Sequence, residues 1–240
     1  MFIKKIILPF IMLLVMSVSV CAEDYSVSPE LSSYGEKIYS EARSYFGRSF
    51  NGYCGTYVKC QLRAMGIFDG KFDFHGNGNQ WYSNFENVET TSGGYYVYRE
   101  SGRDCFDKLT QKYGDNLKNI VVSFPIQAGY SARYPGAGHA FVIYEISDGI
   151  AYYSESFSFG KHREGQVIAE EIDSLIERYE RRHGNLTGCV MLSKLDMDTE
   201  LSMEENALII SELKETIEDF SDIDFIAIEL KGISQSHVTA

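Results

Sequence analysis

The feature that most restricts the fold is a pair of strand-like segments on either side of Ser147-Asp148-Gly149. Residues 140–146 and 150–157 are rich in the aromatic and β-branched side chains that favour strands. A short polar loop that ends in glycine is a common connection between two antiparallel strands. The sequence therefore predicts a hairpin with a three-residue loop, in which Ile146 pairs with Ile150.

Helices are expected on the N-terminal side of this hairpin. Ser28 followed by Pro29 is a favourable helix start, and Gly47 is a favourable end. A second helix is expected from Cys54 to about Met65, because its apolar residues recur at helical spacing. The other elements expected before the hairpin are loops with a short helix over residues 67–94, a helix over 104–113 and a strand over 119–124.

The C-terminal third contains both types of element. Apolar residues from 167 to 179 predict an amphipathic helix, and residues 188–192 predict a strand. Ser202 and Glu205 form a capping box before a further helix, and residues 224–230 predict a last strand. Because helices and strands do not alternate as βαβ units, we expect an α+β fold, with the N-terminal helices packed on an antiparallel sheet.

The first 22 residues have the pattern of a secretory signal peptide. Lys4 and Lys5 give a positive start, an apolar run follows, and Cys21-Ala22 ends the segment with small residues. The run is shorter than the roughly 20 residues that span a bilayer, so we expect an exported protein without a stable membrane anchor. The alternative is acylation of Cys21, which Val20 disfavours. Residues 23–240 are predicted as a single domain with a C-terminal extension from about residue 161.

The acidic composition restricts the partners. The formal net charge is −12, and removal of the two lysines in the signal segment would make it −14. Nucleic-acid binding depends on Lys and Arg side chains that neutralise phosphates, so a nucleic acid is not an expected partner. The oligomeric state is left open.

Four cysteines remain after the predicted cleavage: Cys54, Cys60, Cys105 and Cys189. Cys54 and Cys60 lie roughly 240° apart around one predicted helix, so they cannot form a disulfide with each other. If Cys54 is a working thiol, at most one pair forms among the other three, although an exported protein meets oxidising conditions. The sequence has no Cys-x-x-Cys motif and no two histidines at ligand spacing, so a metal site is not expected.

Cys54 opens its helix directly after a glycine-containing loop. The N-terminus of a helix carries a partial positive charge and free N–H groups, which stabilise a thiolate and lower its pKa. The same N–H groups can stabilise the oxyanion of a tetrahedral intermediate. A small cysteine that packs a helix end is an equally good interpretation of this position taken alone.

His139 begins the first strand of the hairpin, whereas the other histidines lie in polar or glycine-rich stretches or at the C-terminus. With Ile146 opposite Ile150, Glu155 lies on the same face as His139, one diagonal away. A carboxylate there could orient the imidazole and stabilise its charged form. A two-residue loop would move Glu155 to the other face, and Ser154 or Ser156 would then take its place.

These segments resemble the CHAP family of papain-like amidohydrolases and peptidases, relatives of the NlpC-type cell-wall enzymes. The matching pieces occur in the family's order: Gly52-Tyr53-Cys54 with Tyr57-Val58 at a helix start, Gly78-Asn79-Gln80-Trp81, Gly138-His139 at a strand start, and Ser154-Glu155 on the next strand. Phe157 stands where family members often carry Asn, and the usual Pro-Gly-Asp before the histidine strand is absent. The resemblance covers under half of the chain.

The resemblance implies a papain-like core and a secreted or cell-envelope hydrolase that cleaves amide bonds, with peptidoglycan as the substrate. Cys54 would be the nucleophile, His139 the base and Glu155 the residue that orients the base. Asn51 and Tyr53 are candidates for oxyanion stabilisation, Trp81 is a candidate for the substrate cleft, and no metal or cofactor is required. Three alternatives stay open: a secreted protease or toxin-like effector of the same fold, a non-catalytic binding domain with an inert Cys54, and an inhibitor or immunity protein.

Overall fold

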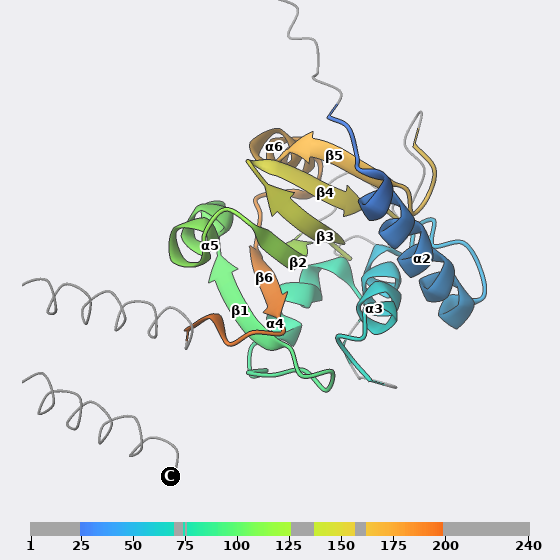
Figure 1. Cartoon of the computed structure of the whole chain (residues 1–240), viewed down its shortest axis with the longest axis horizontal. Coiled ribbons are helices and arrows are strands. Elements are labelled where there is room, and N and C mark those ends of the chain that lie inside the picture. The colour runs from blue at the N-terminus through green and yellow to red at the C-terminus, as the bar shows by residue number, and fades with distance from the viewer. Residues whose placement is uncertain (1–24, 70–73, 75, 126–136, 157–161, 199–240) are drawn as a thin grey trace, which may run out of the picture. The chain divides into compact units, whose positions relative to one another are not determined.

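The first two described helices form where the sequence predicts them. The structure is a computed structural model that describes residues 25–69, 74, 76–125, 137–156 and 162–198. Helix α2 (Pro29–Phe46) follows Ser28, whose hydroxyl accepts a hydrogen bond from the Leu31 N–H at 3.1 Å. It ends at Gly47, which has a φ of 75° that glycine adopts without strain. Helix α3 (Cys54–Ala64) comes next (Figure 1).

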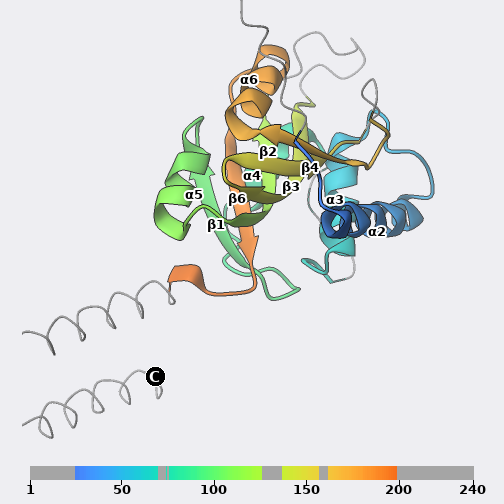
Figure 2. The same ribbon diagram turned by 45° about the horizontal axis from the view of Figure 1, so that its top comes forward.

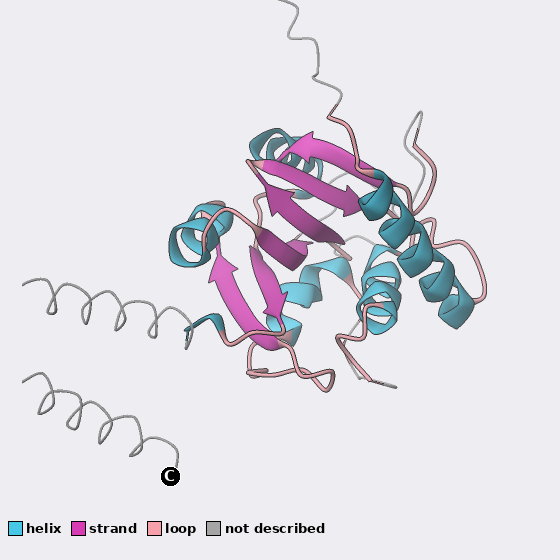
Figure 3. Cartoon of the chain, in the orientation of Figure 1, coloured by secondary structure: helices cyan, strands magenta, loops and turns pink. Residues whose placement is uncertain are grey.

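The described residues form a six-stranded sheet with the strand order β1-β6-β2-β3-β4-β5, in which every pair of neighbours is antiparallel (Figure 3). The strands are β1 (Tyr96–Ser101), β2 (Leu117–Phe124), β3 (His139–Ser147), β4 (Ile150–Ser154), β5 (Val167–Glu171) and β6 (Gly188–Ser193). The remaining helices are η2 (Gly78–Gln80), α4 (Trp81–Asn84), α5 (Cys105–Tyr113) and α6 (Ile172–His183). The expected α+β class with an antiparallel sheet is confirmed, and the assignment to a papain-like core stays a prediction.

The loop of the central hairpin is one residue shorter than predicted. Ser147 pairs with Ile150, so the loop consists of Asp148 and Gly149 alone. Both have positive φ angles, 51° and 75°, which is the combination that a type I′ turn requires. Asp is one of the residues that tolerate this conformation, and it lets the tight turn form.

A bulge in β3 nevertheless restores the predicted register at the far end of the hairpin. The pairing between β3 and β4 shifts by one residue between Ile143 and Glu145, so that Val142 lies opposite Ser154. A bulge places two residues of one strand opposite one residue of its partner, which reverses the faces of everything beyond it. Glu155, which follows Ser154, therefore lies on the side of the hairpin that the three-residue loop predicts.

Two other elements differ from the sequence-based expectations. The helix predicted over residues 167–179 begins only at Ile172, because Val167–Glu171 form the edge strand β5 and pair with β4. A short apolar run is compatible with a helix or a strand. Here these residues form a strand because they pair with the edge of β4. Strand β1 is missed: Tyr96, Val97 and Tyr98 favour a strand, but the second half of the segment, Arg99 to Ser101, is polar.

Helices cover both faces of the sheet (Figures 1 and 2). Ala140, Val142 and Tyr144 of β3 belong to a core cluster that includes Ile38 of α2 and Val58 of α3. The alternate residues of β3 face α6, because side chains of a strand point to opposite faces in turn. The ring of Phe141 thus lies 4.9 Å from the ring of Tyr179 on α6.

Part of the predicted C-terminal extension is integral to the sheet. Strand β5 forms one edge, and β6 lies between β1 and β2 although it comes last in sequence among the described strands. The chain divides into two units, residues 1–194 and 195–240. The predicted signal peptide, the capping box at Ser202 and the strand over 224–230 lie outside the described residues.

Candidate active site

Cys54 is the first residue of α3 and lies at a helix end that no side-chain cap occupies. Tyr53, in the capping position, makes no side-chain hydrogen bond to the helix, so the first N–H groups stay open to other acceptors. The half-buried sulfur lies 4.0 Å from the carbonyl oxygen of Gly138, to which it donates when it is protonated. The N–H groups of Gly55 and Ala140 also face the sulfur and favour its thiolate form.

Glycines allow residues 76–78 to pack closely against the start of α3 and the start of β3, the two elements that carry Cys54 and His139. A Cβ atom on Gly78 would lie 2.6 Å from the Cα atom of His139, and one on Gly55 would lie 1.6 Å from the carbonyl oxygen of Gly76. The Ser123 hydroxyl, which is buried, donates to the carbonyl oxygen of Gly78 at 2.7 Å. Residues 76–78 are therefore wedged between the start of α3 and the start of β3, where larger side chains would push the two apart.

His139 and Glu155 meet at the end of the β3–β4 hairpin. The Nε2 atom of His139 lies 3.5 Å from the Oε2 atom of Glu155, and both side chains are 2% exposed. This separation is longer than a strong hydrogen bond, but catalytic contacts often shorten only when substrate is bound. Because Nε2 faces the carboxylate, Nδ1 is the nitrogen left to face Cys54.

The charges of Cys54 and His139 stabilise each other. Burial alone would raise the pKa of Cys54, but the neighbouring imidazole and the N–H groups outweigh it, and the pKa lies below its ordinary value. Burial alone would lower the pKa of His139, but the charge and hydrogen bond of Cys54, with a smaller contribution from Glu155, raise it to about 10. Both shifts therefore favour the pair of a thiolate and an imidazolium, the state in which a cysteine is nucleophilic.

Two aromatic side chains of α6 also contact the imidazole, and sequence reasoning missed both. The ring centroid of His139 lies 5.1 Å from that of Tyr179 and 4.7 Å from that of His183, with interplanar angles of 7° and 16°. A signal was present in the sequence: Tyr179 and His183 are four residues apart, so they share a helix face with the buried Leu175 and Ile176. A histidine in an apolar stripe is unusual, because histidine is only intermediate in its tendency to be buried.

The three predicted oxyanion and cleft residues have different environments. Asn51 is exposed in the loop before Cys54. Tyr53 is 42% exposed, and the Arg48 guanidinium lies 4.6 Å from its ring centroid. Trp81 is 0% exposed and belongs to the core cluster, so its ring is a packing element behind the helix start and is not on an accessible cleft wall.

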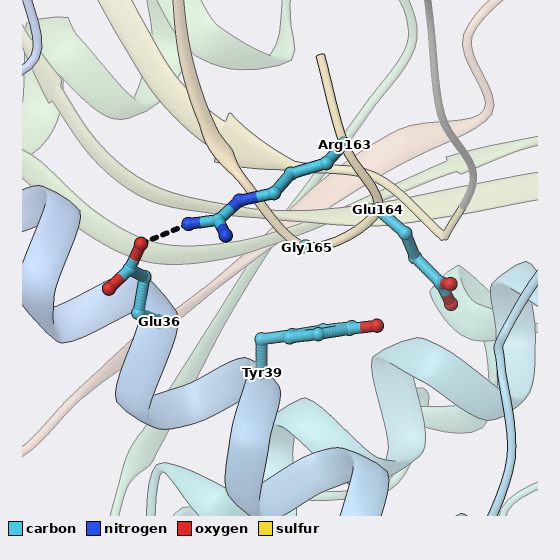
Figure 4. Close-up of a pocket in the computed structure, with 5 residues that line it drawn as sticks. All are labelled: Glu36, Tyr39, Arg163, Glu164 and Gly165. Carbon is cyan, nitrogen blue, oxygen red and sulfur yellow. Dashed lines mark hydrogen bonds and ion pairs between the residues drawn. The ribbon is translucent and has the colours of Figure 1, made fainter.

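A small pocket of about 240 Å³ lies between α2 and the segment before β5 (Figure 4). It is lined by Glu36, Tyr39, Arg163, Glu164 and Gly165, and Arg163 forms an ion pair with Glu36 across it. None of the three candidate catalytic residues lines this pocket. Glu164 accepts hydrogen bonds from the Phe50 N–H and from the Ser49 hydroxyl. This pocket wall therefore holds the loop that leads to Cys54.

All four described cysteines are free, and the side chains of Cys105 and Cys189 are hydrogen-bonded neighbours. Among the residues that the structure describes, no group of three Cys, His, Asp or Glu side chains could hold a metal ion. No helix within the described ranges is both long and apolar enough to cross a bilayer.

The geometry therefore brings together residues from three separate parts of the chain: a thiol at a helix N-terminus, an imidazole at a strand start and a buried carboxylate directly after the next strand. This is the arrangement of nucleophile, base and orienting group that acyl transfer through a cysteine needs. No protein-family model, curated protein or solved structure matches this chain.

Proposed function

We propose that this protein is an exported cysteine hydrolase that cleaves amide bonds, with Cys54 as nucleophile and His139 as its acid and base. The single observation that supports this most is the placement of Cys54, at the uncapped start of α3, beside a buried imidazole that also faces a buried carboxylate; this placement lowers the pKa of Cys54 and raises that of His139. A cysteine that merely packs a helix end would lie among apolar side chains, and burial there would raise its pKa.

In the proposed reaction the Cys54 thiolate attacks the carbonyl carbon of the amide, and the carbonyl π electrons move onto oxygen. The backbone N–H of Cys54, at the open end of α3, would stabilise this oxyanion, and Asn51 and Tyr53 are the nearby candidates to assist it. The His139 imidazolium then donates its proton to the leaving amine as the C–N bond breaks, which leaves a thioester on Cys54.

Hydrolysis of the thioester completes the cycle. Neutral His139 removes a proton from a water molecule, and the resulting hydroxide attacks the thioester carbonyl. The C–S bond breaks and releases the carboxylic acid, and the Cys54 thiolate and the His139 imidazolium form again. Glu155 would keep the imidazole oriented and stabilise its positive charge, since its carboxylate is buried and faces Nε2.

Peptidoglycan is the substrate that we propose, and this part rests on the resemblance to the CHAP family and on the N-terminal export pattern. Its stem peptides and cross-bridges offer amide bonds outside the cytoplasm. Release of soluble fragments from purified peptidoglycan, followed by mass spectrometry, identifies the bond. The control is the Cys54→Ala variant, which keeps the surface of the protein and lacks the nucleophile.

The first test needs no substrate. We expect iodoacetamide to label Cys54 well below pH 7, because the thiolate persists there, and peptide mass spectrometry reads the labelled site. In His139→Ala the labelling should require a pH near the ordinary thiol value of about 8.5. Labelling of the wild type that rises only above pH 8 would contradict the catalytic proposal and favour a binding domain.

A further inference from the structure

Helix α6 supplies a second wall to the candidate site. Tyr179 and His183 lie one turn apart, with their ring centroids separated by 5.6 Å and their planes inclined by 22°. Since both are also nearly parallel to His139, the imidazole lies across the two α6 rings. The three centroid distances are similar, so the two α6 rings lie side by side and do not enclose His139 between them.

The polar atoms of these two rings are not explained by packing. Tyr179 is 1% exposed and His183 is 6% exposed. Neither the Tyr179 hydroxyl nor the Nδ1 atom of His183 has a hydrogen-bond partner among the described residues. An unsatisfied buried polar atom costs about 1–3 kcal/mol, so an aliphatic side chain such as Leu would serve better if filling space were the only role. A contribution to the neighbouring site would compensate for this cost.

We propose that Tyr179 and His183 are positioning residues that form an aromatic platform for His139 and stabilise its imidazolium form. A cation within about 6 Å of a ring centroid is attracted to the π face, and the attraction is larger when the pair is desolvated. The platform also restricts rotation of the imidazole, so that Nδ1 stays directed at Cys54 and Nε2 at Glu155. This inference rests on the proposed function, because it assigns the platform to the base of that reaction.

The platform works as long as His183 is uncharged, and the structure favours that state. Burial, together with the nearby charges of His139 and Arg182, lowers the pKa of His183 to about 3. At neutral pH, a neutral imidazole therefore lies beside the imidazolium. A second positive ring at 4.7 Å would instead repel it.

Charged and titratable groups reach His139 from three elements. Cys54 comes from α3, Glu155 from the end of β4, and Tyr179 and His183 from α6. Arg178 of α6 has a charge interaction with Glu155, and its guanidinium carbon also lies 4.7 Å from the ring centroid of Tyr179. A change in the pH response of Cys54 can therefore be assigned to the platform only if the other groups stay in place.

The test compares His183→Leu with His183→Phe, both of which remove the titratable group and keep a large apolar side chain. Leu has no π face, whereas Phe keeps one. We expect His183→Leu to reduce the iodoacetamide labelling rate of Cys54 at pH 6 about tenfold, which corresponds to roughly one pKa unit. His183→Phe should stay within about threefold of the wild type, a range that corresponds to half a pKa unit.

Arg181→Ala is the matched control on the same helix, because this arginine is 64% exposed and pairs with Glu177 away from the stack. It should leave the labelling profile unchanged. Thermal melts followed by circular dichroism select the pH range in which every variant is folded. Equal labelling rates in His183→Leu, His183→Phe and the wild type would overturn the proposed platform role. Equal losses of labelling rate in His183→Leu and His183→Phe would overturn it as well. A wild type without labelling below pH 7 would instead refute the reactive pair itself, and the platform with it.

Discussion

Two of the cysteines that the structure describes open helices, and their surroundings make them chemically different. Cys54 is the first residue of α3 and Cys105 is the first residue of α5, and neither helix has a side-chain hydrogen bond from its capping residue. Cys54 is half-buried beside the imidazole of His139. Cys105 is 0% exposed and lies beside Cys189, whose pKa is raised well above its ordinary value by burial and by the neighbouring thiol.

The comparison teaches that a helix N-terminus alone does not create a nucleophile. Both helices offer N–H groups and a partial positive charge to their first residue. The difference is a cation supplied from a distant part of the chain: β3 brings His139 to α3, whereas β6 brings a second thiol to α5. A neighbouring imidazole that can carry the proton stabilises the thiolate. Burial without such a neighbour destabilises the thiolate and raises the pKa of the thiol.

The largest expected effect separates the two cysteines by activity. Cys54→Ala should lower hydrolysis by a factor of about 10³ or more, because the covalent route is lost. Cys105→Ala should keep hydrolysis within a few-fold but reduce the free energy of unfolding by about 1 kcal/mol, a typical cost for a change in the core. Parallel assays of peptidoglycan hydrolysis and urea unfolding measure both. Full activity in Cys54→Ala would remove the distinction between the two sites.

A smaller effect is expected when the charge that supports the Cys54–His139 pair is removed, which brings the surroundings of Cys54 closer to those of Cys105. Glu155→Gln removes the carboxylate that favours the imidazolium, so the pKa of Cys54 should rise and the labelling rate at pH 6 should fall. We expect a loss of about 10- to 100-fold, on the order of one to two pKa units, and less than in His139→Ala. The pH profile of alkylation measures both variants. No change in Glu155→Gln would show that another group orients the imidazole.

The last expected effect concerns stability, not reactivity. The pKa of His183 is about 3 in the folded protein and about 6.5 in an unfolded chain, so below pH 6.5 the unfolded state binds more protons. The stability that the uncharged His183 contributes to the folded state is complete above pH 6.5 and is lost as the pH falls toward 3. His183→Phe should therefore lose fewer degrees of melting temperature than the wild type between pH 7 and pH 4.

Cys105→Ala is the control for that measurement. It lies away from the histidines and should lower the melting temperature by a similar amount at every pH in the range. Calorimetry or circular dichroism at matched ionic strength gives the melting temperatures. A wild-type curve that runs parallel to that of His183→Phe would contradict the buried, uncharged state of His183.

The sequence was a good guide where local chemistry determines the structure. Ser28 and Gly47 bound α2 as predicted, because capping depends on a few neighbouring residues. The loop of the central hairpin was predicted wrongly, since an Asp-Gly pair also forms a two-residue turn. A bulge on β3 compensated for the error in register, and no local pattern near Tyr144 indicates that bulge.

Its guidance was weaker where a residue's role depends on distant segments. Trp81 was predicted to line a cleft, but neighbouring core residues bury it completely. Residues 167–171 were predicted to be helical, but the edge of β4 pairs with them. The contributions of Tyr179 and His183 depend on how α6 packs against β3, which is a contact between segments about 40 residues apart.

The sequence by itself determined the helix that presents Cys54, the strand that begins with His139, and the α+β character of the chain. These follow from caps, turns and apolar periodicity, which act over a few residues. Only the tertiary structure decided that these residues meet, that Glu155 lies on their side of the hairpin, and that α6 covers the imidazole. The physical reason is that the pKa values of Cys54 and His139 depend on burial and on charges from other segments.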